Sequence, residues 1–87
     1  MTMNAEQIRA ARALLNWSQG DLVKASKLSL TTIRRMEDGA IGPQRSSVGN
    51  VEAVQRALES AGVTFIDAGA PSAGGGVGVR LTDVAVK

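Results

Sequence analysis

Apolar side chains recur every three or four residues along most of residues 1–62, which is the spacing that places them on one face of a helix. The first such stretch predicts a helix over residues 5–15. Asn4, with Gln7 three residues later, has the pattern of a capping box at its start. Asn16 can adopt the left-handed backbone conformation that ends a helix.

Two shorter helices follow, separated by a break of turn length. Ser18 caps the first, which we expect over about residues 19–25. Ser29 caps the second, expected over about residues 30–38 with Gly39 just past its end. The sequence therefore predicts two short helices joined by a tight turn.

A fourth helix is expected after an ordered loop at residues 39–45. Ser46 or Ser47 caps this helix and Gly62 ends it. Four of its apolar residues are spaced for burial on one face: Val48, Val51, Val54 and Leu58.

Residues 63–66 and 77–81 are rich in β-branched side chains, and the segment 67–76 between them is rich in Gly, Ala, Pro and Ser. This pattern favours a β-hairpin with a glycine-rich loop. Its second strand alternates, with three side chains predicted on one face: Val77, Val79 and Leu81. Such a strand either covers the helical core or pairs with its copy in a second subunit.

The fold expected from these patterns is mainly α. Four helices occupy residues 1–62, a hairpin extension and candidate dimerisation element occupies residues 63–82, and a disordered tail occupies residues 83–87. A chain of 87 residues holds one small core, so a partner subunit would help its stability.

Composition restricts the chemistry available to the chain. The sequence contains no Cys and no His, so disulfides, thiolate catalysis and the usual zinc ligands are excluded. Its seryl hydroxyls have no histidine to activate them, and no carboxylates cluster as an acid/base pair would. We therefore expect neither an enzyme nor a bound metal or cofactor. No apolar run is long enough to span a membrane, and a cytoplasmic location is the default expectation.

Positive charge gathers in the first half of the chain. The net charge is only +2, but residues 1–45 carry seven Lys and Arg against four acids, whereas the remainder carries three against four. An asymmetry of this size is compatible with a nucleic-acid partner, although many solvated helix faces are as basic. The charge alone therefore leaves the partner open.

Residues 8–39 resemble the Cro/phage-repressor (XRE) class of helix-turn-helix regulators. The residues that carry the resemblance are Arg12, Ser18, Gln19, Leu22, Ser29, Thr32, Ile33, Arg35, Glu37 and Gly39. The resemblance extends over residues 4–61. It implies a four-helix lambda-repressor-like DNA-binding domain whose third helix enters the major groove of double-stranded DNA.

The resemblance also implies roles for particular residues. Arg12 and Glu37 would form a buried ion pair that holds the third helix to the scaffold. Base contacts would come from the start of that helix and its exposed side: Ser29, Leu30, Thr31, Arg34 and Arg35. Phosphate contacts would come from Gln19, Thr32, Gln44 and Arg45.

Other interpretations of these side chains remain open. Leu30 could instead make a hydrophobic contact inside the turn or with a partner protein. Arg34 and Arg35 could be ordinary solvated charges, and one of the two could meet phosphate rather than base. Trp17 is expected as a lid over the first helix and not as a base-stacking platform.

The sequence departs from the family pattern at three points. Lys27 stands where the family has a turn glycine, Val23 stands where a small residue is common, and the hairpin replaces the usual fifth helix. A lysine with positive φ costs about 1 kcal/mol, so the turn is less favourable than in the family.

The expected function is a sequence-specific transcription regulator that binds a DNA operator as a homodimer. Its two copies of the third helix would occupy major-groove segments about 34 Å apart. The alternative is an antitoxin or anti-activator of the same fold, which would bind another protein through residues 63–82.

Overall fold

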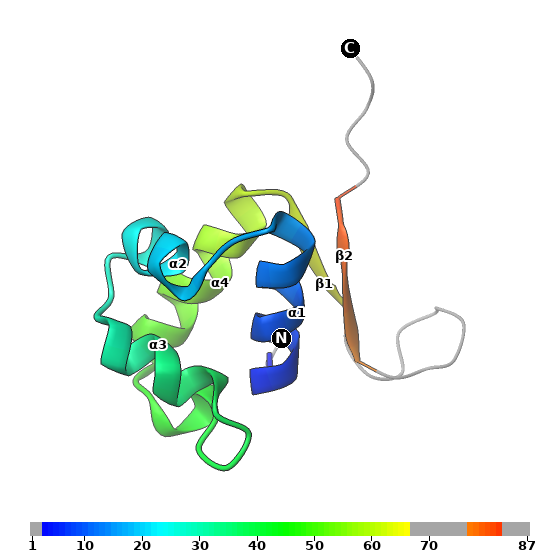
Figure 1. The fold of residues 1–87 in the computed structure, drawn as a ribbon. Coiled ribbons are helices and arrows are strands. Elements are labelled where there is room, and N and C mark those ends of the chain that lie inside the picture. The colour runs from blue at the N-terminus through cyan, green and yellow to red at the C-terminus, as the bar shows by residue number, and fades with distance from the viewer. Residues whose placement is uncertain (1–2, 67–76, 83–87) are drawn as a thin grey trace.

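The computed structural model describes residues 3–66 and 77–82. Figure 1 shows the helices gathered around one core with the strands at one side. In chain order the elements are α1 (Ala5–Leu15), α2 (Gln19–Ser26), α3 (Leu30–Glu37), the 3-10 helix η1 (Pro43–Arg45), α4 (Val48–Ser60), β1 (Val63–Ile66) and β2 (Gly78–Leu81). The predicted mainly helical fold with a C-terminal antiparallel hairpin is confirmed. The expected glycine-rich loop, 67–76, and tail, 83–87, lie outside the described residues.

Each α-helix begins where a side chain satisfies a free backbone N–H of its first turn. The capping side chains belong to Asn4, Ser18, Ser29 and Ser47. Asn4 and Ser18 form full capping boxes, in which Gln7 and Asp21 bond back to the cap residue. The sequence predicted either Ser46 or Ser47 as the cap of α4. In the structure Ser47 caps this helix.

The helix ends depend on backbone conformations that few residues adopt. Asn16 ends α1 with φ 57°, as predicted, and Lys27 ends α2 with φ 64°. Gly62, with φ 110°, follows α4 and turns the chain into β1. The third helix ends one residue earlier than predicted, because Asp38 is extended and its carboxylate accepts a hydrogen bond from the backbone N–H of Ala40.

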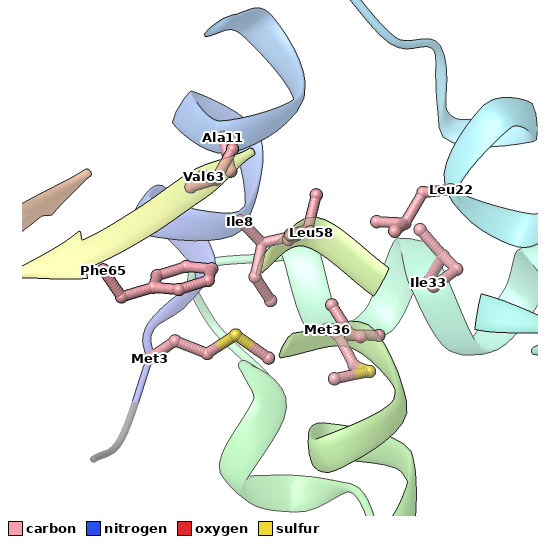
Figure 2. Packing of buried hydrophobic residues seen from close by; sticks show 10 residues of the cluster. Met3, Ile8, Ala11, Leu22, Ile33, Met36, Leu58, Val63 and Phe65 are labelled. Carbon is pink, nitrogen blue, oxygen red and sulfur yellow. The ribbon is translucent and has the colours of Figure 1, made fainter. Parts of the chain in front are cut away.

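The core brings together apolar side chains from every α-helix and from β1 (Figure 2). Its buried members are Met3, Ile8, Ala11, Leu22, Ile33, Met36, Val54, Leu58, Val63 and Phe65. Met3 precedes the cap residue Asn4, and both Met3 and Ile8 are fully buried, which is the arrangement of a hydrophobic staple. Trp17 is partly buried and packs against this core.

One predicted core position is wrong. Val48 is 75% exposed, although Val54 and Leu58 on the same helix are fully buried. Val48 is the first residue of α4 and lies roughly 120° around the helix axis from Val54, so it points away from the core.

The hairpin packs against α1 and α4. Val63 pairs with Leu81 and Phe65 pairs with Val79, and because paired side chains share a face, all four lie on the core side of the sheet. The second strand begins at Gly78 rather than at residue 77 as predicted. The side-chain amide of Gln7 donates to the carbonyl oxygens of Ile66, at 3.3 Å, and Gly78, at 3.0 Å, and so fixes both strands to α1.

Candidate functional site

The second and third helices are joined by a short turn that the local sequence makes rigid. Lys27 takes the left-handed conformation, and the hydroxyl of Ser26 accepts the backbone N–H of Leu28 at 3.3 Å. Ser29 then caps α3. Together these bonds fix the angle at which α3 leaves the turn.

A buried ion pair holds the far end of α3 against α1. Arg12 Nε lies 2.6 Å from Glu37 Oε2, and Arg12 Nη2 lies 2.8 Å from Glu37 Oε1, so the two groups pair through two parallel hydrogen bonds. The side chain of Glu37 is only 3% exposed and that of Arg12 is 20% exposed. Such planar bidentate pairing fixes orientation as well as distance.

Two further bonds complete this clamp, which we define as Arg12, Glu37 and Gln19. Gln19 Nε2 donates to Glu37 Oε1 at 3.1 Å, and Arg12 Nη1 donates to the carbonyl oxygen of Trp17 at 3.0 Å. The clamp therefore joins α1, the segment between α1 and α2, the start of α2 and the end of α3. Gln19, expected as a phosphate contact, has its amide group directed at Glu37.

Several side chains at the start and on the outer side of α3 do not pack into the core. The exposed residues at its start and along its outer face are Ser29, Leu30, Thr31, Arg34 and Arg35. Leu30 is 38% exposed, so part of its side chain is open to solvent and part is covered by the protein. Thr31, Arg34 and Arg35 lie on the side of α3 away from the buried Ile33 and Met36, whereas Ser29 and Leu30 are exposed at the start of the helix.

The hydroxyl groups of Ser29 and Thr32 are engaged with each other. Their oxygen atoms lie 2.9 Å apart, and Ser29 Oγ also accepts the backbone N–H of Thr32 at 3.1 Å. These two groups therefore stabilise the start of α3. Among the described residues, no side chain hydrogen-bonds to the Thr31 hydroxyl or to the guanidinium groups of Arg34 and Arg35, which are exposed.

A hollow of about 260 Å³ lies beside α3, between this helix and the start of α4. Arg35 and Arg45 both line it, and they bring two positive charges to one place. The other polar residues around it are Thr32, Ser46, Ser47 and Asn50. Because α4 begins here, its positive dipole end adds to the same field.

Gln44 does not belong to the residues that line this hollow. Gln44 Nε2 donates to the carbonyl oxygen of Met3 at 2.9 Å. Its amide nitrogen therefore ties the segment before α1 to η1. Gln44 and Arg45, expected together as phosphate contacts, have different surroundings.

Several polar residues around the hollow were not predicted as site residues. Ser47 was expected only as a helix cap, and Asn50 was not singled out. Asn50 Nδ2 donates to Ser46 Oγ at 2.9 Å, and Asn50 N donates to Ser47 Oγ at 3.1 Å. The i, i+3 and i, i+4 spacing of these residues was the available signal.

Two other kinds of site find no support in residues 3–66 and 77–82. No group of three or more His, Cys, Asp or Glu side chains is placed to hold a metal ion there. No helix in that part of the chain combines the length and apolar content needed to cross a membrane.

Comparison of the sequence with protein-family models and with curated proteins gave no match to any family or relative. The function proposed for this chain accordingly rests on the geometry and charge of the outer face of α3 and of the hollow beside it.

Proposed function

We propose that this chain is a sequence-specific DNA-binding transcription regulator, in which α2 and α3 act as a helix-turn-helix and α3 enters the major groove. The observation that carries the proposal is the clamp of Arg12, Glu37 and Gln19. It holds α3 rigidly while leaving the outer face of the helix uncovered. Groove recognition requires this combination, because base edges are read by side chains held in fixed positions.

The outer face of α3 has the chemical variety needed to distinguish base pairs. The guanidinium of Arg35 can donate two hydrogen bonds to guanine, and Leu30 and Thr31 offer methyl groups to thymine. Arg34 adds a second cation on the same face. An apolar residue such as Leu30 is unfavourable in water but useful against a thymine methyl group.

The hollow beside α3 fits a phosphate of the DNA backbone. Arg45 and the start of α4 supply positive potential, and the surrounding hydroxyl groups supply donors. Contacts of this kind fix how deeply and in which register a recognition helix sits. Arg35, which lines the same hollow, lies where it can reach either the base edge or this phosphate.

We propose that the regulator acts as a homodimer on a DNA site with two-fold symmetry. Two copies of α3 would read half-sites separated by whole turns of the double helix, about 34 Å per turn. A single module contacts few base pairs, and two copies give the discrimination needed against non-specific sites.

The test is selection of bound duplexes from a random pool, followed by measurement of affinity by fluorescence anisotropy. We expect one enriched sequence, and an affinity that falls steeply with salt because cations contact phosphates. Arg35→Ala should relax the preference at one base pair, with a loss of about 10-fold or more on the selected duplex. Arg45→Ala should weaken all duplexes alike and reduce the salt slope by about one.

Arg56→Ala is the matched control, because Arg56 is an exposed cation on α4 and lies outside the hollow beside α3. It should leave the sequence preference unchanged. If the pool yields no preferred sequence, or if Arg35→Ala behaves like Arg56→Ala, the proposal is wrong.

A further inference from the structure

We propose that β2 pairs edge to edge with β2 of a second copy of this chain, so that the two hairpins form one four-stranded antiparallel sheet. The proposal names the surface by which the homodimer of the proposed regulator forms. Figure 1 shows β2 at the margin of the molecule, on the side away from α3. The pairing would leave the outer face of α3 free.

The backbone of β2 offers an open edge. Thr82 N donates to the carbonyl oxygen of Gly62 at 2.6 Å. Because hydrogen-bonded and non-hydrogen-bonded residue pairs alternate along an antiparallel hairpin, this bond identifies which residues of β2 bond to β1. Residues at even positions of β2 therefore bond to β1, whereas the N–H and C=O groups of Val79 and Leu81 point away from it. Within residues 3–66 and 77–82 the sheet consists of these two strands, and no other strand lies beside this edge.

The side chains beside this edge are apolar and only partly covered. Leu81 is 52% exposed and Val77 is 48% exposed, although Leu81 pairs with the fully buried Val63. Leu14 lies two helical turns beyond Gln7 on the side of α1 that faces the hairpin, and it is 42% exposed. The apolar face of the sheet that packs on the core therefore extends to the open edge, where its side chains are only partly covered.

The edge is complementary to itself. A two-fold axis at Val79 places Val79 opposite its own copy and Leu81 opposite Val77 of the second chain. In that register the outward N–H and C=O groups of Val79 meet those of its copy, those of Leu81 face Val77 of the second chain, and the two half-exposed side chains cover each other. One-residue shifts would place the apolar side chains of one copy on the polar face of the other.

Charge agrees with the same register. Arg80 is the one charged residue of β2, and it lies on the outer face of the sheet. The axis at Val79 sets Arg80 opposite Gly78 of the second copy, so the two arginines do not face each other. Gly78 also leaves open space beside its backbone, with nothing within 4 Å of an added Cβ.

The hairpin is already held in the shape that this pairing needs. Gln7 fixes both strands at the end near Gly78, and the hydroxyls of Thr64 and Thr82 meet at 2.8 Å on the outer face. Little conformational freedom remains to be lost at the edge when the second strand arrives.

Sedimentation velocity on the whole chain without DNA, combined with amide hydrogen exchange, tests the proposal. We expect a dimer at micromolar concentration, with the amides of Val79 and Leu81 protected more strongly as concentration rises. Val79→Pro removes an outward backbone donor without removing a bond between β1 and β2, and should weaken dimerisation by about 30-fold. Leu81→Lys should weaken it at least as much and tests the pairing independently if the proline variant folds poorly.

Ala25→Lys is the matched control, since it adds the same charge at an exposed position of α2, on the opposite side of the molecule from β2 in Figure 1. It should leave the dimer intact. A chain that stays monomeric, a dimer in which Val79 and Leu81 exchange freely, or a dimer that survives both edge variants would overturn the proposal. A dimer that selects no DNA sequence would refute the proposed function and leave this inference standing.

Discussion

Glu37 is a buried carboxylate that accepts hydrogen bonds from two side chains, Arg12 and Gln19. An unpaired charge at such a position is strongly unfavourable, because the surrounding side chains cannot replace the lost water. The position of α3 relative to α1 therefore depends on this ion pair as well as on packing in the shared core. Arg12 lies on α1 and not on the exposed face of α3, but through Glu37 it affects the orientation of that face.

Arg12→Ala should lower the free energy of unfolding by about 3 to 5 kcal/mol, since it leaves the Glu37 carboxylate buried without its cation. Urea unfolding followed by circular dichroism measures the change. Arg9→Ala is the control on the same helix: Arg9 lies 3.6 Å from Glu6, and both side chains are about half exposed or more. That variant should change stability by less than about 1 kcal/mol. Equal effects of the two variants would show that the clamp is not stabilising.

At the scale of elements, the α2–α3 turn carries a local strain that the sequence already indicates. Lys27 has a φ of 64°, a conformation that costs a side chain about 1 to 2 kcal/mol and costs glycine none. Asn16 takes a similar conformation at the end of α1, but asparagine tolerates it better. The turn after α2 is therefore the less favourable of the two.

Lys27→Gly should raise the free energy of unfolding by about 0.5 to 1 kcal/mol, because relief of strain exceeds the added entropy of the unfolded chain. Thermal unfolding measures the gain. Lys24→Gly serves as the comparison, since Lys24 lies inside α2, where glycine should destabilise by about 1 kcal/mol. A loss of stability in both variants would contradict a strained turn at Lys27.

At the scale of the whole molecule, one side chain couples the helical part to the hairpin. Gln7 is only 3% exposed; its amide oxygen completes the capping box with Asn4, and its amide nitrogen reaches both strands. A two-stranded hairpin is marginal by itself, so its order depends on this attachment and on burial of Val63 and Phe65.

Gln7→Glu should keep the cap, because a carboxylate oxygen can still accept from Asn4, but it removes the donor and sets a charge against two carbonyl oxygens. We expect hairpin amides to lose protection in hydrogen exchange while α2 and α3 keep theirs. Asn4→Ala should do the reverse, weakening the start of α1 by about 1 kcal/mol and leaving the hairpin protected. Uniform loss of protection in both variants would show that helices and hairpin open as one unit.

Local rules determined much of this protein. The four helices, their caps, the left-handed Asn16 and the pairing of the two strands follow from residues close together in the chain, since capping and periodicity act within a few positions. The exposed start of α3 was also predictable, because its apolar stripe leaves one face unused. The ion pair of Arg12 and Glu37 was expected only through a resemblance.

The tertiary structure decided what depends on contacts between distant residues. Gln7 bonds to Gly78, 71 positions away, and Gln44 bonds to Met3, 41 positions away; no local pattern contains either bond. Packing also exposed Val48 and placed Arg35 beside Arg45. Sequence patterns fix which side of a helix is apolar, but only the packed arrangement fixes how far that side is covered and which polar groups meet around it.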